Sequence, residues 1–271
     1  MDPSILKFFA AYIEKELGII YADSNYFQLQ NRLEEVAKTY NFSGVDELYK
    51  KSQKNIPDNL KQHLLDLATN NETSFFRDVK VFNGINFLLS KCIDEKNFNN
   101  DFRIWSAACS TGQEPISLSI LLHELAKKSH HQFKFKIHGS DISERALKKA
   151  MKGQYSTFEL SRGLSEEYKT KYFESVGNEN WQVSSDIMRP ITFKKRNLKE
   201  ILEFDDLNHF IFCRNVLIYQ KVESKIEILN QITKNLISGG YLILGSGESL
   251  FGLSNSYEQV MVEGAVFYRK L

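Results

Sequence analysis

Apolar residues recur with a helical period through the first third of the chain. Ile5, Phe9, Ile13 and Leu17 lie on one face of a predicted helix that ends at Gly18. Three more helices are predicted before residue 70. The residues that indicate them are Phe27, Leu29, Leu33, Val36 and Ala37 over 26–40, Ser43 as the cap of the third helix, and Pro57 at the start of the fourth. Because no strand pattern precedes Phe102, residues 1–90 are predicted to form a helical N-terminal domain with its linker.

From Phe102 onward, short apolar runs alternate with helical ones. Strands are predicted at 102–106, 133–139, 191–193, 210–213 and 241–244, and helices at 116–125, 143–151 and 222–236, the last ended by Gly239-Gly240. Residues 154–190 break this rhythm and are predicted to form an inserted helix and small β-element. Residues 257–268 alternate as a closing hairpin. The fold class is therefore α/β over 91–271, with a mostly parallel sheet covered by helices on both faces.

The turn after the first predicted strand contains only small residues, from Ala107 to Gly112, and Ser110 or Thr111 is expected to cap the next helix. A strand, a small-residue turn and a helix form the front half of a nucleotide-binding unit, in which ligands bind beyond the carboxyl ends of the strands. Asp141 ends the second strand, where a carboxylate either accepts hydrogen bonds from a ribose or caps a helix. The turn lacks GxGxxG, which disfavours a dinucleotide and favours a cofactor without phosphates, such as S-adenosylmethionine.

Composition narrows the range of partners. The 271 residues carry a formal net charge of +1, which argues against binding to nucleic acid or to anionic lipid. Neither a signal-peptide pattern nor a membrane-spanning run is found, so we expect a cytoplasmic protein without membrane insertion. The three cysteines form no CxxC pair and suit a reducing compartment. The motifs contain no cluster of metal ligands, and we expect no metal.

Five segments together resemble the CheR-type chemotaxis receptor methyltransferases. These segments are Asn71–Asp78 (NETSFFRD), Ser110–Pro115 (STGQEP), Gly139–Ser143 (GSDIS), Asn197-Leu198 and Phe212–Tyr219 (FCRNVLIY). The resemblance implies a Rossmann-like class I S-adenosylmethionine methyltransferase domain, joined to an N-terminal helical domain and carrying a small inserted β-subdomain. It also implies transfer of a methyl group to glutamate side chains of chemoreceptors, which yields methyl esters and S-adenosylhomocysteine.

The resemblance also implies roles for particular residues. Asn71, Thr73 and Arg77 are expected to line the cofactor site from the linker, Glu114 and Asp141 from the first two turns, and Asn197 and Leu198 beside the adenine. Arg214 and Asn215 are expected beneath the methionine end. Arg77, Arg214 and Tyr219 are expected to orient the methyl acceptor and to be the catalytic residues.

Each of these residues also has a purely structural interpretation. Asn71 and Thr73 are good helix caps, and Arg77 can pair with Asp78 or with a nearby carboxylate. Arg214 follows four apolar strand residues, so its charge requires a partner or a ligand. Phe75 and Phe76 are interpreted as interdomain core, and Cys109, Cys213 and His138 as buried filler.

The proposed chemistry needs no general base, because a glutamate side chain with a pKa of about 4.3 is already ionised near neutral pH. Catalysis then consists of aligning the carboxylate with the methyl group. Three alternatives stay open: a module that binds S-adenosylmethionine without turnover, a Rossmann-type dehydrogenase and a nucleic-acid methyltransferase.

The expected partner is the cytoplasmic helical domain of a chemoreceptor, bound by a monomer. A weak basic face with Arg32 and Lys38, or the lysines at 50, 51, 54 and 61, is the hypothetical docking surface. Some relatives of this kind hold a C-terminal receptor pentapeptide on the β-subdomain. Because the loop over 174–181 is short, we expect no such tether here.

Overall fold

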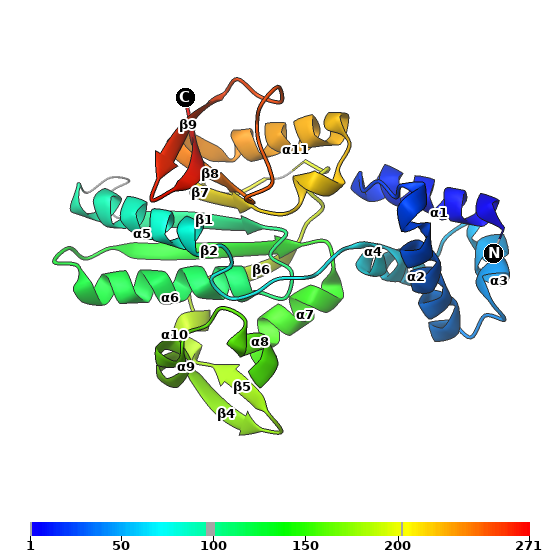
Figure 1. Ribbon diagram of the computed structural model, residues 1–271, viewed down its shortest axis with the longest axis horizontal. Coiled ribbons are helices and arrows are strands. Elements are labelled where there is room, and N and C mark those ends of the chain that lie inside the picture. The colour runs from blue at the N-terminus through cyan, green and yellow to red at the C-terminus, as the bar shows by residue number, and fades with distance from the viewer. Residues whose placement is uncertain (1, 96–100, 202) are drawn as a thin grey trace.

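The computed structural model describes residues 2–95, 101–201 and 203–271. Its first four helices are α1 (Pro3–Leu17), α2 (Tyr26–Thr39), α3 (Val45–Ser52) and α4 (Asp58–Ala68), with the short 3-10 turn η1 (Asp23–Asn25) before α2. They form a group on one side of the molecule (Figure 1) and share a hydrophobic core of their own. Gly18 ends α1 in the left-handed conformation, as predicted. This group is called the helical module below.

Two details of the helical module differ from the sequence predictions. Phe27 is 72% exposed on α2, although it was expected to face inward. It lies at the first turn, beyond the stripe formed by Leu29, Leu33 and Val36. The cap of α3 is Gly44, because the backbone N–H and the hydroxyl of Ser43 both donate to Glu47 instead.

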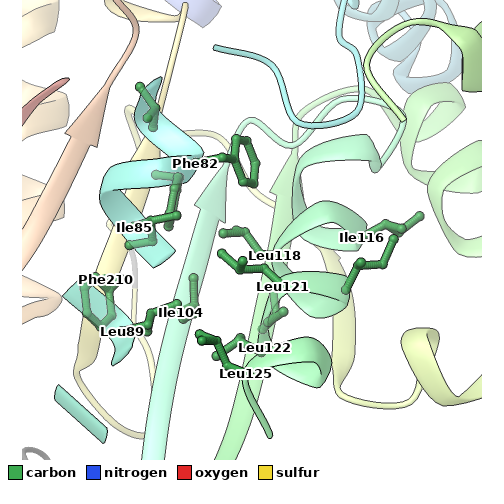
Figure 2. Packing of buried hydrophobic residues seen from close by; sticks show 14 of the residues in the cluster. Phe82, Ile85, Leu89, Ile104, Ile116, Leu118, Leu121, Leu122, Leu125 and Phe210 are labelled. Atoms are coloured by element: carbon green, nitrogen blue, oxygen red, sulfur yellow. The ribbon is translucent and has the colours of Figure 1, made fainter. Parts of the chain in front are cut away.

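Helix α5 (Val79–Asp94) belongs by its packing to the second part of the chain. Its buried residues, among them Phe82, Ile85 and Leu89, lie in one cluster with the central sheet and not with α1–α4. Figure 2 shows these side chains beside Ile104 and Phe210, which come from two strands of that sheet. We therefore propose that the helical module ends near residue 68, and not at 90.

The central sheet has seven strands in the order β6-β2-β1-β7-β8-β10-β9. The strands are β1 (Asp101–Ala107), β2 (Lys134–Asp141), β6 (Ile191–Lys195), β7 (Asn208–Cys213), β8 (Leu236–Leu244), β9 (Tyr257–Val262) and β10 (Ala265–Lys270). Neighbouring strands are parallel from β6 through β2, β1 and β7 to β8, and β10 is antiparallel to both of its neighbours. The topology places the carboxyl ends of β1, β2 and β7 at one edge.

Helices cover both faces of this sheet. Side chains alternate along β7, so Phe210 and Phe212 face α5 and α6 (Gln113–Lys128), while Ile211 and Cys213 face α11 (Val222–Lys234). α5 and α6 run across the same face (Figures 1 and 2), and α7 (Glu144–Lys152) packs near β2 and β6. The predicted α/β architecture is confirmed.

The stretch 154–190 forms a small subdomain below the sheet in Figure 1. It contains β3 (Gln154–Ser156), α8 (Thr157–Ser161), α9 (Glu166–Tyr172), β4 (Phe173–Gly177), β5 (Asn180–Val183) and α10 (Ser185–Met188). Its three strands pair antiparallel in the order β3-β5-β4. The phenyl ring of Phe75 packs against Tyr155 and Phe173 of this subdomain. The insertion is thus fixed to the segment that joins the helical module to the sheet.

Two turn predictions were wrong. Neither Ser110 nor Thr111 caps α6, whose N-cap is Gly112 with a φ of 93°. The Ser110 hydroxyl donates instead to the carbonyl of Asn71. Gly239-Gly240 does not precede a new strand but lies inside β8, which begins at Leu236 directly after α11. Ser143, in contrast, caps α7 as predicted and accepts a hydrogen bond from the N–H of Ala146.

Candidate functional site

A cleft lies at the carboxyl ends of β1, β2 and β7, between the sheet and the segment over 69–78 that joins it to the helical module. It contains about 1030 Å³ of space, including its opening to solvent. Every site residue that the sequence suggested lines it. These residues are Asn71, Thr73, Arg77, Glu114, Asp141, Asn197, Leu198, Arg214, Asn215 and Tyr219. The fold therefore brings together positions that are far apart in the sequence.

Asp141 organises the part of the cleft between β1 and β2. Its Oδ2 accepts the N–H of Ser110 at 2.8 Å and its Oδ1 accepts the N–H of Ser143 at 2.9 Å. Burial raises the pKa of Asp141, the backbone hydrogen bonds lower it in part, and the nearby Asp66 carboxylate raises it further. A buried carboxylate at the end of the second strand is the position at which this kind of sheet binds ribose hydroxyls.

The turn between β1 and α6 approaches the cleft with its backbone. Ala108 and Ser110 have φ values of 57° and 52°, in the left-handed region that costs free energy for residues other than glycine. The hydrogen bond from Ser110 to Asp141 holds this conformation, as does the N–H of Cys109, which donates to the carbonyl of Ser140. This conformation places Ala108, Cys109 and Ser110 along the cleft.

Arg214 lies at the centre of a buried ion cluster. Its Nη1 donates to Oε2 of Glu114 at 2.9 Å, and its Nη2 donates to the carboxylate of Asp78 and to the carbonyl of Arg77. The Arg214 side chain is only 3% exposed. The charge that required a partner has two carboxylates, and both terminal nitrogens are engaged by them, while Nε is buried with no hydrogen-bond partner among the described residues. Arg214 is better suited to hold Glu114 and Asp78 in place than to touch the acceptor.

The mouth of the cleft is formed by Tyr219 and by the segment over 69–78. Tyr219, in the short 3-10 turn η3 (Leu217–Tyr219), is 39% exposed and its hydroxyl accepts a hydrogen bond from Asn70. Arg77 does not pair with Asp78 but donates from Nη1 to the carbonyl of Glu72. Both side chains therefore lie where an incoming group enters.

Asn197 and Leu198 line the opposite wall, and they also connect the two parts of the chain. The Nδ2 of Asn197 donates to the carbonyl of Glu16 at the end of α1, and its Oδ1 accepts the N–H of Lys199. Leu198 is buried beside Trp105 and Ile211. The guanidinium of the neighbouring Arg196 lies over the ring of Phe204. This wall combines the amide of Asn197 with the apolar side chain of Leu198.

Sequence reasoning missed one polar residue that shapes the site. The carboxylate of Glu248, in the turn after β8, accepts the N–H groups of Asn215, Val216, Ile218 and Gly245. No periodic pattern marks this residue, since it lies in a loop. Three of its four partners are backbone groups 30 to 33 positions earlier, so no pattern of side chains indicates them either.

The remaining candidate groups are structural. All three cysteines are buried, and burial raises the pKa of the Cys109 and Cys213 thiols well above the usual value. His138 lies on β2, with its Nδ1 close to the hydroxyl of Thr192. Within residues 2–95, 101–201 and 203–271, no group of three or more potential metal ligands comes together. In the same residues, no helix is both long and apolar enough to cross a membrane.

Arg32 does not provide the exposed positive charge that the docking hypothesis required. Its guanidinium donates to the carbonyl of Ala68 at 3.0 Å and to the hydroxyl of Tyr21, and it lies against the Tyr21 ring. These contacts tie α2 to the end of α4. Lys61 is paired with Glu16, whereas Lys50, Lys51 and Lys54 are exposed. Lys38 on α2 is exposed as well, so the hypothetical docking surface reduces to these three lysines and Lys38.

Comparison with known families gives the site an identity. Residues 71–266 match the family model described as "CheR methyltransferase, SAM binding domain". The chain belongs to the CheR methyltransferase family. Every candidate residue of the cleft lies inside the matched range, which begins at Asn71 and includes α5. S-adenosylmethionine is therefore the cofactor of this protein.

Curated relatives of the CheR family match almost the whole chain. The chemotaxis protein methyltransferase Cher2 of Pseudomonas putida is 34% identical over 96% of both chains. Chemotaxis protein methyltransferase 1 of Pseudomonas aeruginosa is also 34% identical over 96% of both chains. The enzyme called chemotaxis protein methyltransferase 1 in Vibrio cholerae is 33% identical over 96% of this chain and 94% of its own. The chain is accordingly an S-adenosylmethionine-dependent methyltransferase of the chemotaxis type.

Proposed function

We propose that this CheR-family protein methylates glutamate side chains on the cytoplasmic helices of chemoreceptors. The products are glutamate methyl esters and S-adenosylhomocysteine. The relatives are named for methylation in chemotaxis, and the cleft supports a carboxylate as the acceptor. The observation that carries the proposal is the absence of an available base among the described residues that line the cleft.

Neither histidine nor lysine occurs among those lining residues, and each of the lining carboxylates is already hydrogen-bonded. Glu72 pairs with Arg162, Glu114 with Arg214, and Asp141 accepts backbone N–H groups. An amine or hydroxyl acceptor must lose a proton to a general base. A glutamate side chain, with a reference pKa of about 4.3, arrives already ionised. The site therefore fits an acceptor that is nucleophilic without first losing a proton.

The residues of the cleft fit the cofactor chemically. Asp141 offers carboxylate oxygens at the ribose position, and the wall of Asn197 and Leu198 suits an adenine. The Oδ1 of Asn215 is buried with no hydrogen-bond partner among the described residues, so a donor on the methionine end can satisfy it. When bound, S-adenosylmethionine supplies an electrophilic methyl group on a positively charged sulfur.

The side chains at the mouth then act on the acceptor. We assign Arg77 and Tyr219 to orient its carboxylate for in-line displacement, because both line the cleft at its entrance. Arg214 is assigned a positioning role through Glu114 and Asp78. Orientation and removal of water from the carboxylate supply the rate enhancement, since no proton is transferred.

The test is incubation of the purified protein with radiolabelled S-adenosylmethionine and cytoplasmic receptor fragments. We expect label on the receptor that is released as methanol by mild base, because esters hydrolyse under these conditions and amide or amine methyl groups do not. Base-stable label would reject the glutamate assignment. Cofactor binding without labelling of any receptor fragment would favour a sensor or scaffold module.

Receptor docking through the helical module is tested separately. Exchanging Lys50, Lys51 and Lys54 for glutamate changes only exposed positions. We expect slower receptor methylation with unchanged S-adenosylhomocysteine affinity, and a matched set with lysine replaced by glutamine should show a smaller effect. If the glutamate variant methylates the receptor at the normal rate, the acceptor docks elsewhere.

A further inference from the structure

The carboxylate of Glu248 lies behind the loop that follows β7. Its Oε2 accepts the N–H of Asn215 and of Gly245, both at 2.7 Å. Its Oε1 accepts the N–H of Val216 at 2.9 Å and of Ile218 at 3.2 Å. Four backbone donors from two separate loops thus converge on one half-buried side chain. Because each oxygen has two donors, both are fully used.

The chain around Gly245 is shaped to permit this arrangement. The N–H of Glu248 donates to the carbonyl of Gly245 at 2.9 Å, which closes a tight turn and directs the carboxylate back toward the loop. A side chain at Gly245 would come within 2.9 Å of the Glu248 Oε2 and of the Asn215 backbone nitrogen, and within 2.8 Å of the Asn215 Nδ2. The position therefore needs glycine for close approach and not for an unusual φ.

The loop that Glu248 holds contains a residue in a strained conformation. Asn215 has a φ of 59° and lines the cleft. Such a conformation persists only where neighbouring groups fix it. The Asn215 Oδ1 is buried and has no hydrogen-bond partner in the described part of the chain. A buried acceptor without a partner is costly, unless a ligand supplies the donor.

We propose that Glu248 is a positioning residue for cofactor binding, which acts by fixing the backbone of Asn215 so that its side chain meets the bound S-adenosylmethionine. Glu248 itself does not line the cleft. This inference rests on the proposed site, since it requires Asn215 to contact the cofactor. It adds a residue from the turn after β8, which is outside all of the segments that suggested the family.

Glu248→Gln is the most informative variant. Its amide keeps the shape of the side chain, but one oxygen becomes an NH₂ group that cannot accept. Whichever way the amide turns, two backbone donors lose their acceptor and face another donor. Because these donors then no longer hold the backbone of Asn215, we expect affinity for S-adenosylhomocysteine to fall roughly 10-fold by calorimetry. Glu248→Asp keeps the carboxylate and should restore part of the affinity.

A double-mutant cycle with Asn215→Gly separates positioning from general destabilisation. Glycine tolerates the φ of 59° and removes only the side chain. If Glu248 acts through Asn215, adding Glu248→Gln to Asn215→Gly should weaken binding by less than about twofold beyond Asn215→Gly alone. Glu258→Gln, which breaks an exposed pair with Arg269 on the final hairpin, is the matched control and should bind normally.

Each outcome has a definite meaning. A Glu248→Gln protein that melts earlier but binds S-adenosylhomocysteine like the wild type would show a purely structural anchor and overturn the inference. Fully additive effects in the cycle would do the same. If the wild-type protein itself does not bind S-adenosylhomocysteine, the site assignment fails, and that result is distinguishable from failure of Glu248 alone. Should Glu248→Gln not fold, Glu248→Asp, which keeps the charge, replaces it in the cycle.

Discussion

The Nη1 of Arg214 and the Oε2 of Glu114 meet at 2.9 Å, which joins the end of β7 to the first turn of α6. The second oxygen of Glu114 accepts the hydroxyl of Ser106 at 2.7 Å, so this carboxylate is held from both sides. The two side chains are 3% and 12% exposed. The ion pair is therefore part of the interior of the protein, although both residues border the cleft.

Replacing Arg214 by methionine should strongly destabilise the fold. The substitution leaves the Glu114 and Asp78 carboxylates without their cation, and breaking a buried pair in this way costs about 3–5 kcal/mol. Urea denaturation measures the loss. Arg269→Met removes an exposed pair with Glu258 and should cost less than about 1 kcal/mol. Similar losses for the two variants would show that the Arg214 cluster is not desolvated in solution.

Affinity for S-adenosylhomocysteine should decrease as the pH falls through the raised pKa of Asp141. Ribose hydroxyls donate best to the ionised carboxylate, and burial raises this pKa above 3.8. Because the folded pKa is the higher one, ionisation of Asp141 also opposes folding, and that cost disappears as the pH falls. Calorimetric titration over a pH series, with circular dichroism as the check on folding, measures the effect. An Asp141→Asn protein should bind weakly and without this pH dependence.

Asp66 connects the helical module to the cofactor site and should tune the same titration. Its Oδ1 accepts the N–H of Glu144 at the start of α7 and the Nε2 of Gln62, both at 3.0 Å. Its negative charge contributes to the raised pKa of Asp141. Asp66→Asn should therefore move the acid limb of S-adenosylhomocysteine binding to lower pH. No displacement of the limb, in a protein that is still folded, would mean that the two carboxylates do not interact.

The pH dependence of the free energy of unfolding tests how the inserted subdomain is attached to α6. Burial disfavours the charge of Glu124 on α6, but hydrogen bonds from Lys171, Tyr172 and Lys127 outweigh this effect and lower its pKa to about 2. A lowered pKa stabilises the fold above the unfolded value of 4.5, and the stabilisation is lost as the pH falls through about 2. Glu124→Gln should reduce the free energy of unfolding by about 1–2 kcal/mol at neutral pH.

The difference between wild type and Glu124→Gln should then shrink in acid and vanish near the lower pKa. Chemical denaturation at a series of pH values gives this comparison. The exposed acid Glu95, which pairs with Lys91 at 3.8 Å, provides the control substitution. A stability difference that does not change with pH would contradict an ionic origin.

Elements with a clear period could be predicted from the sequence. β7 is buried along its whole length and β1 is buried from Ile104 onward, and their apolar runs indicated both strands. Asp141 lies at the end of a strand, where this topology places a ligand. Recognition of the family motifs then gathered the remaining cleft residues. Sequence reasoning succeeded where a residue's role depends on its own element.

Roles that depend on tertiary contacts were not accessible. The apolar stripe of α5 indicates a helix but not which core it joins. The charge of Arg32 gives no sign that its guanidinium turns inward to the carbonyl of Ala68. The sequence indicates that Arg214 needs a partner, but not that the partners are Glu114 and Asp78. Two successive glycines suggested a stop, although Gly239, with a φ of 75°, and Gly240 both lie within β8.

The segment from Thr69 to Asp78 is at once the tether of the helical module, the roof of the cleft and the support of the inserted subdomain. Arg162 of the insertion pairs with Glu72, and the Ser110 hydroxyl holds the Asn71 carbonyl. Ligand binding in the cleft is therefore thermodynamically coupled to the packing of the helical module and the inserted subdomain against this segment. If the bound cofactor strengthens the packing of these two units by some free energy, their packing strengthens cofactor binding by the same amount.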